Sequence, residues 1–246
     1  VDRNTAEEAV NKITVEYEVL HPISNVETAM ADGAPIILED LIGDHIGEQV
    51  ADTNIAKIFR HEFGDVEDAF NKSDLVIERT VEMSMVHQGY IEPHNATAIW
   101  AEDGNITIWS STQGSFGVRS QTAGLLGIPE SKVKVNYVEI GGGFGGKTKV
   151  YFTPIAALLS QKSGGRPVKF IMDRPSVFEA SGPAPGGKIR MKIGVNKNGK
   201  ITAADTDLML ESGGYPGSAV GAAAICVFAC YDIPASRITG YDILVN

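Results

Sequence analysis

Hydrophobic and polar residues alternate in many short segments of this chain, as they do in half-buried β-strands. Strands are predicted at residues 13–19, 75–85, 97–100, 106–109, 133–140, 168–173, 189–195, 201–211 and 238–245. Helical spacing and capping residues predict a short helix from Thr5 and helices near residues 25–31, 65–72, 116–126, 151–161 and 219–230. Strands that alternate with helices, with hairpin turns at residues 102–105 and 197–199, predict an α+β (mixed α/β) fold.

Residues 141–146 contain five glycines and lie between a predicted strand and a predicted helix. Glycine allows the backbone to take up positive φ and to approach another group closely. The N-terminus of a helix offers free N–H groups and the positive end of its dipole. The loop therefore predicts backbone amides that face an oxyanion, a phosphate or an oxo group.

Two specific nucleotide-binding patterns and one purely structural interpretation also fit this loop. Gly141, Gly146, Lys147 and Thr148 match the phosphate-loop pattern, and a strand at 168–173 could end in a magnesium-binding aspartate. Such loops normally open their domain, however, whereas about 140 residues precede this one. The dinucleotide pattern G-x-G-x-x-G also fits but lacks an acidic residue on a second strand. The remaining possibility is a flexible turn whose glycines serve packing.

The composition excludes some partners and suggests a compartment. The 246 residues carry a formal net charge of −10, which argues against a nucleic-acid surface. The longest apolar stretch, residues 219–230, is too short for a membrane span and predicts a buried helix. Cys226 and Cys230 are spaced by four residues on that helix and are predicted to be apolar core residues. Two such thiols and the lack of a signal peptide predict a cytoplasmic protein.

His87, Glu92 and His94 form a cluster of metal-ligating residue types, as do Cys226 and Cys230, which could share a metal only with further partners nearby. A proline within the first cluster keeps its three residues from sharing one helix face, so a zinc-protease arrangement is excluded. The functional interpretation of this cluster is a metal site in a loop. The preferred interpretation is a polar turn between two strands, in which the histidines and the glutamate satisfy backbone groups. The chain also begins without methionine, which suggests a piece of a larger protein.

Three ordered motifs resemble those of a known family. They are HQGYIEPH at 87–94, STQ at 111–113 and GGGFGGK at 141–147, and the resemblance continues at 168–175 and 212–215. In this order and spacing they resemble the molybdenum-cofactor subunit of molybdenum hydroxylases, the family of xanthine dehydrogenase, aldehyde oxidase and carbon monoxide dehydrogenase. The resemblance covers essentially the whole chain. It implies that residues 1–58 end a small α/β, hammerhead-like domain and that residues 59–246 begin the molybdopterin-binding domain.

The resemblance also implies a set of cofactor contacts. Gln113 matches the glutamine that hydrogen-bonds the apical oxo ligand of molybdenum, and is the implied catalytic residue. Gly142, Gly143, Phe144 and Gly145 match the backbone that lies against the metal and its dithiolene. The metal itself is held by a molybdopterin, for which the cytosine dinucleotide form is one option, and no side chain of this chain binds it directly. A neutral amide suits an oxo group because it adds no charge near the metal. Lys147 would be peripheral in this arrangement.

The family reaction hydroxylates an electron-poor carbon with water as the oxygen source, and electrons leave through [2Fe-2S] clusters to FAD. Those cofactors are implied on other domains or subunits, which would be the partners of this chain together with the rest of the molybdenum subunit. The family's glutamate base has no match here, so the chain alone is expected to be inactive. Thr148 replaces the acidic residue of purine-oxidising relatives, which disfavours xanthine and leaves aldehydes, other N-heterocycles, aromatic thioesters and carbon monoxide open.

Overall fold

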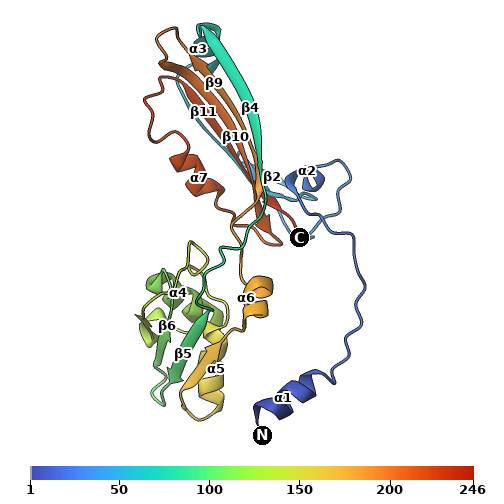
Figure 1. Cartoon of the computed structure of the whole chain (residues 1–246), viewed down its shortest axis with the longest axis vertical. Helices are drawn as coiled ribbons and strands as arrows, with labels where there is room; N and C mark the ends of the chain where they lie inside the picture. Colours follow the sequence, from blue (N-terminus) through green and yellow to red (C-terminus); the bar gives the residue numbers. More distant parts are fainter. Residues whose placement is uncertain (1) are drawn as a thin grey trace. The chain divides into compact units, whose positions relative to one another are not determined.

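The computed structural model describes residues 2–246, which fold into two compact units (Figure 1). The first unit contains the described residues 2–76 and 193–246, and the second contains Ile77–Lys192. The chain therefore leaves the first unit once and returns to it. The predicted boundary near residue 58 concerns domains of the resembled family and remains a prediction; in the structure, residue 58 lies within the strand Ile55–Phe63. Within residues 2–246, no helix is long and apolar enough to cross a membrane.

The first unit is built on a twisted sheet of long strands. The sheet has seven strands in the order β2-β1-β3-β11-β10-β9-β4. Their bounds are β1 Gly43–His45, β2 Glu48–Val50, β3 Ile55–Phe63, β4 Leu75–Met83, β9 Gly187–Val195, β10 Ile201–Gly213 and β11 Ser236–Leu244. Of these, β4 and β9 contain the unit boundaries at residues 76/77 and 192/193, so each is shared by the two units. The helices that belong to it are α1 Arg3–Val10, α2 Val26–Ala29, α3 Val66–Asn71 and α7 Val220–Cys226. In Figure 1, α7 lies against the sheet and α3 at one end of it, and both contact β10.

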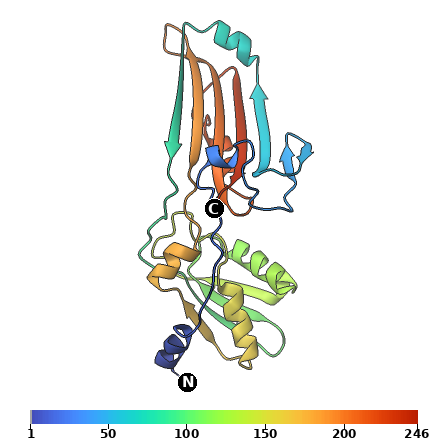
Figure 2. The ribbon, with the colours of Figure 1, turned by 90° about the vertical axis from the view of Figure 1, so that its right-hand side faces the viewer.

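The second unit carries the predicted glycine loop. Its sheet has four strands in the order β7-β6-β5-β8: β5 Asn95–Trp100, β6 Ile106–Ser110, β7 Val133–Tyr137 and β8 Val168–Ile171. The helices are α4 Ser115–Leu126, α5 Thr153–Lys162 and α6 Arg174–Ala180, with a short 3₁₀ turn at Glu130–Lys132. Figure 2 shows α4 (green) and α5 (gold) packed against this sheet. Between them lies an apolar core of Ala98, Ile106, Ile108, Ala123, Val133, Ala156 and Ala157.

Most predicted elements are present, and two predictions are wrong. Residues 13–19 alternate like a strand, but they form no strand, and Ile13, Val15, Tyr17 and Val19 are all exposed. A strand needs a neighbour for its N–H and C=O groups, and the described residues provide none for this segment. The elements β1–β3 and α6 were not predicted from the sequence pattern.

The second wrong prediction concerns the alanine-rich helix. It ends at Cys226 instead of Cys230, and both cysteines are exposed and free. Val220 and Ala224 are the buried residues of α7 and share one face at a spacing of four. Cys226 lies two positions beyond Ala224 and so points away from that face. Residues 219–230 are small or apolar on every side, so the sequence does not indicate which side of the helix is buried.

Candidate functional site

The glycine loop connects β7, at one edge of the four-stranded sheet, with α5. Gly142 and Gly145 adopt positive φ angles of 92° and 90°, which favour glycine. Phe144 between them also has a positive φ of 48°, and its side chain is 73% exposed. A bulky residue in the left-handed region costs about 1–3 kcal/mol, and such strain is concentrated at functional sites. The loop thus holds a strained, exposed aromatic residue among glycines.

Gln113 lies beside this loop, in the connection between β6 and α4. The strands β6 and β7 are parallel neighbours, so their carboxyl ends bring Gln113 and the loop to the same edge of the sheet. The Gln113 side-chain oxygen accepts hydrogen bonds from the backbone N–H groups of Gly145 at 3.0 Å and Lys147 at 3.1 Å. A Cβ atom on Gly143 would lie 2.5 Å from that oxygen. The five predicted cofactor contacts therefore lie together at this edge of the sheet. They are Gln113, Gly142, Gly143, Phe144 and Gly145.

The hydrogen bonds orient the Gln113 carboxamide. Because two N–H groups donate to one end of it, that end must be the oxygen and the other end the NH₂ group. Among the described residues, the NH₂ group has no hydrogen-bond partner in the structure. The side chain is exposed, so the NH₂ group can donate to an outside group. The site thus presents a neutral, oriented donor.

Glu92 and Lys147 form an ion pair beneath the loop. The Lys147 Nζ atom lies 2.5 Å from Glu92 Oε2, and the Lys147 side chain is fully buried. Burial acts to raise the pKa of Glu92, but hydrogen bonds from Lys147, Gly141 and Asn95 outweigh it and hold that pKa below its usual 4.5. Lys147 is therefore a buried, paired residue beneath the loop, and its peripheral place relative to the cofactor remains a prediction. The glycines before Lys147 and the polar residues after it gave no sign that its charge is paired with a residue 55 positions away.

This arrangement gives no support to the phosphate-loop interpretation. A phosphate-binding lysine must present its ammonium group to the ligand, whereas Lys147 Nζ points inward to Glu92. The helix after the loop begins at Thr153 instead of directly after the lysine. Asp173, the candidate magnesium ligand, caps α6 by accepting a hydrogen bond from the Ser176 N–H group at 2.8 Å.

His87 and His94 belong to a hydrogen-bonded network instead of a metal site. No group of three or more possible metal ligands occurs among the described residues. His87 Nδ1 accepts the Gly89 N–H group, so Nε2 carries the proton and donates to Ser181 Oγ at 2.9 Å. The Tyr90 hydroxyl lies 2.6 Å from His94 Nε2 and 3.1 Å from Ser181 Oγ. His87 and Glu92 do accept hydrogen bonds from backbone N–H groups, as the preferred interpretation expects, whereas His94 pairs with the side chain of Tyr90.

His94 is buried and neutral. Burial lowers its pKa to about 4, with help from the positive charge of Lys147. The Ser181 hydroxyl donates to Val177, so the Tyr90 hydroxyl must donate to Ser181. Tyr90 in turn accepts a hydrogen bond from His94 Nε2. The chain of donors ends when the Ser181 hydroxyl donates to the Val177 carbonyl in α6. The network therefore ties the turn after β4 to α6.

The helix α6, which the sequence pattern did not predict, contacts the site. Arg174, the first residue of α6, donates from Nη1 to the Tyr90 carbonyl at 3.0 Å and from Nη2 to the Ile91 carbonyl. Ser181 follows the end of α6 and is buried. Arg174 lies within the 168–175 motif, which is the one sequence signal that could have indicated it.

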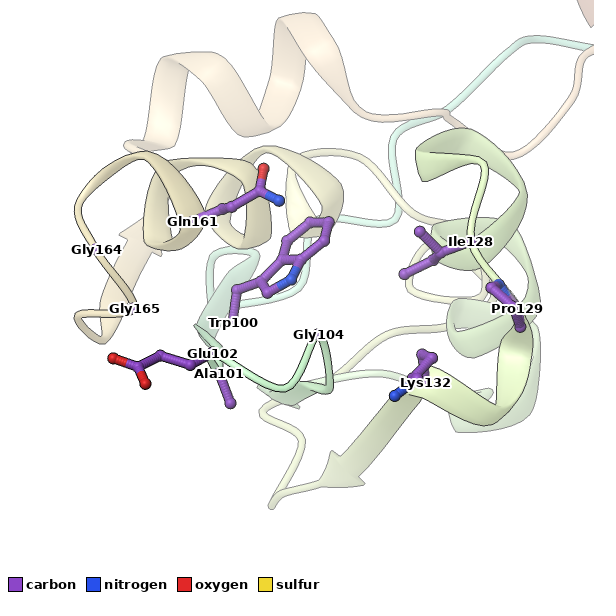
Figure 3. Close-up of a pocket in the computed structure, with 10 residues that line it drawn as sticks. All are labelled: Trp100, Ala101, Glu102, Gly104, Ile128, Pro129, Lys132, Gln161, Gly164 and Gly165. Carbon is purple, nitrogen blue, oxygen red and sulfur yellow. The ribbon is translucent and has the colours of Figure 1, made fainter.

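A separate hollow lies at the other end of β6 (Figure 3). Its volume is about 570 Å³, and Figure 3 shows the Trp100 side chain between those of Gln161 and Ile128. The remaining lining residues are Ala101, Glu102, Gly104, Pro129, Lys132, Gly164 and Gly165. Trp100 pairs with Ile106 at the start of β6, whereas Gln113 follows its end. None of the predicted site residues lines this hollow.

Comparisons with known proteins show which family this chain belongs to. A family model described as "Molybdopterin cofactor-binding domain" matches residues 47–246. The chain is 29% identical over 243 residues to the nicotinate dehydrogenase large molybdopterin subunit of Eubacterium barkeri, covering 98% of this chain and 54% of that protein. It is 32% identical over 215 residues to a xanthine dehydrogenase molybdenum-binding subunit of Escherichia coli, covering 87% of this chain and 27% of that protein.

A solved structure shares the fold. The reconstituted CO dehydrogenase from Oligotropha carboxidovorans matches with a TM-score of 0.79 at 26% identity, over 99% of this chain and 32% of that one. The chain thus spans about half of one of these three proteins and about a third or less of each of the other two.

Proposed function

Because this chain belongs to the molybdopterin cofactor-binding domain family, we propose that it forms the first part of the cofactor site in the catalytic subunit of a molybdenum hydroxylase. The observation that supports this proposal best is the orientation of Gln113. Its carboxamide oxygen is held by the amides of Gly145 and Lys147, so its NH₂ group is available to donate to an oxo group. A side chain that merely filled space would not need this arrangement.

The residues present fit such a group. The left-handed backbone at Gly142, Phe144 and Gly145 leaves the loop open to close approach, and a Cβ on Gly145 would meet nothing within 4 Å. The side-chain oxygen of Gln88 is buried, has no hydrogen-bond partner among the described residues, and would lie 3.0 Å from a Cβ on Gly146. We propose that Gln113, Gly142, Gly143, Phe144 and Gly145 contact the molybdenum-molybdopterin cofactor. When bound, that cofactor supplies two-electron oxidative hydroxylation with water as the oxygen source.

The residues around Gln113 keep its surroundings electrically neutral. Gln113 itself is uncharged, and the charges of Glu92 and Lys147 cancel in one ion pair. A net charge next to the bound group would shift its reduction potential and the acidity of its ligands. Glu92 cannot serve as the general base, because Lys147, Gly141 and Asn95 already donate to its carboxylate.

Activity of the whole protein needs more than this chain. We propose that the base and the remaining cofactor contacts come from the rest of the molybdenum subunit, that FAD and [2Fe-2S] clusters lie on partner domains or subunits, and that the isolated chain is inactive. The substrate is proposed to be an aldehyde, an N-heterocycle or a related small molecule. Thr148 donates its hydroxyl to the Gly145 carbonyl at 3.1 Å, so it stiffens the loop and offers no negative charge to a purine. A cytoplasmic location remains part of the proposal.

The test is the molybdenum and pterin content of the complete gene product, purified with its accompanying subunits. We expect close to one molybdenum and one pterin per subunit. Absence of molybdenum, from a host that inserts it into a control enzyme, would contradict the proposal. A parallel titration with Mg²⁺ and ATP tests the alternative, since a phosphate loop requires binding that Lys147→Ala abolishes. We expect no nucleotide binding with either lysine or alanine at this position.

A further inference from the structure

The ammonium group of Lys147 lies inside the protein, beneath the glycine loop. It donates to Glu92 Oε2 at 2.5 Å and to Ser111 Oγ at 3.5 Å. It also lies 4.9 Å from the centroid of the Tyr90 ring, whose face attracts cations. Burying a charge is costly unless the charge is paired and hydrogen-bonded, and Glu92 provides the pairing.

Glu92 holds the opposite end of the loop with the same oxygen atom. Glu92 Oε2 accepts the Gly141 N–H group at 2.8 Å, and the Glu92 N–H group donates to the Gly141 carbonyl at 3.2 Å. A Cβ atom on Gly141 would lie 2.5 Å from Glu92 Cβ, so this approach requires glycine. Gly141 and Lys147 are the first and last residues of the segment 141–147, here called the glycine segment. One carboxylate therefore closes the segment at both ends.

The Lys147 end also carries the hydrogen bonds that orient Gln113. The Lys147 N–H group donates to Gln113 Oε1 at 3.1 Å, and the Gln113 N–H group donates back to the Lys147 carbonyl at 2.9 Å. Thr112 Oγ1 donates to the same carbonyl at 3.0 Å. A shift of the Lys147 backbone would therefore move the Gln113 carboxamide with it.

We propose that Glu92 and Lys147 are positioning residues, whose buried ion pair closes the glycine segment and sets the orientation of the Gln113 carboxamide. The link to the cofactor rests on the proposed function, because Gln113 is a cofactor contact only within it. Charge-assisted hydrogen bonds are shorter and stronger than neutral ones, so they suit this role. We call the Glu92–Lys147 pair with its bond to Gly141 the clamp. Because the pair has no net charge, it holds the loop without placing a net charge near the bound group.

The clamp itself is tested by hydrogen exchange of the loop amides in the complete, cofactor-free subunit. Lys147→Met removes the ion pair, and we expect the amides of Gly145 and Lys147 to exchange about tenfold or more faster. Glu92→Gln keeps an acceptor for the Gly141 N–H group, whereas Glu92→Ala removes it. Exchange at Gly141 should therefore rise in Glu92→Ala and much less in Glu92→Gln.

The control for this experiment is Glu82→Gln, which removes the ion pair of Glu82 with Lys188 at 3.2 Å, between β4 and β9. It should leave exchange in the loop unchanged. Wild-type exchange rates in Glu92→Ala would overturn the proposal. The result does not depend on molybdenum, so a wild-type protein without molybdenum would contradict the proposed function and leave the clamp tested.

A second variant separates positioning from simple stabilisation. Glu92→Gln combined with Lys147→Met leaves no unpaired buried charge, so the thermal midpoint should recover toward the wild-type value. The two ends of the glycine segment are not linked in this double variant. The amides of residues 145 and 147 should therefore continue to exchange fast. In the loaded enzyme, the electron paramagnetic resonance spectrum of the reduced metal centre should also differ from wild type. If the double variant shows wild-type exchange and a wild-type spectrum, the pair only stabilises the fold and the proposal is wrong.

Discussion

Gln113 lies so close to Gly143 that a methyl group on Gly143 would come within 2.5 Å of the Gln113 carboxamide oxygen. The two residues are 30 positions apart in the chain and meet because they follow neighbouring parallel strands, β6 and β7. Their contact leaves no room for any side chain at position 143. The position of the carboxamide is thus defined by the loop backbone.

Gly143→Ala should displace Gln113 from the amides of Gly145 and Lys147. Real Cβ contacts below 3.0 Å are essentially absent from proteins, so either the loop or the side chain must move. In the complete enzyme we expect lower molybdenum content and roughly 100-fold slower turnover, the usual cost of misplacing a contact group by about 1 Å. Metal analysis and steady-state kinetics measure both.

Gly124→Ala is the matched control, since a Cβ at this position in α4 would meet nothing within 4 Å. Alanine in a helix interior should stabilise the protein by about 0.5–1 kcal/mol and leave turnover unchanged. Full molybdenum content and full turnover in Gly143→Ala would show that the loop adapts without cost.

Gln113→Glu distinguishes the role of the carboxamide oxygen from that of the NH₂ group. A glutamate can still accept hydrogen bonds from Gly145 and Lys147, so hydrogen exchange in the loop should change little. It replaces the NH₂ donor by a negatively charged acceptor, so turnover of the complete enzyme should fall by roughly 10²–10³-fold, as for the loss of an oxyanion donor. Turnover equal to wild type would refute the role proposed for the NH₂ group.

Acid should destabilise the second unit through His94. Its pKa is about 4 in the folded protein and about 6.5 when unfolded, so the unfolded chain binds more protons between these values. The free energy of unfolding should therefore decrease as the pH falls from 6.5 toward 4, by up to about 3 kcal/mol. Urea unfolding between pH 7.5 and pH 5 measures the slope.

His94→Gln removes this titration and should flatten the slope, although the substitution itself costs stability at neutral pH. An unchanged slope in His94→Gln would mean that other groups cause the acid sensitivity.

Asp173 should matter to stability and not to magnesium. Its carboxylate caps α6 through the Ser176 N–H group, and replacing such a cap by alanine costs about 1 kcal/mol. Asp173→Asn keeps a capping oxygen and should cost only a few tenths of a kcal/mol. Thermal unfolding distinguishes the two variants. A magnesium-dependent shift in wild type that Asp173→Asn abolishes would revive the phosphate-loop interpretation.

Local chemistry in the sequence was enough to predict much of the second unit. The turn at residues 102–105 does join β5 and β6, and the glycines do follow β7. Such features depend on φ preferences and on side-chain spacing along a few residues, which the sequence displays directly. The grouping of Gln113 with residues 142–145 came from the family resemblance, and the contacts of Gln113 with Gly143 and Gly145 in the structure agree with it.

Tertiary structure alone decided the features that depend on distant partners. Residues 13–19 alternate as regularly as β4, yet only β4 has a neighbouring strand to receive its hydrogen bonds. The sequence did not show what the charge of Lys147 contacts, and its burial depends on Glu92, which lies 55 residues earlier. Burial of a charge is decided by which groups the fold places within about 4 Å, and no local pattern encodes that distance. The sequence by itself thus determined the elements and the loop, whereas the fold determined which side chains hold that loop closed.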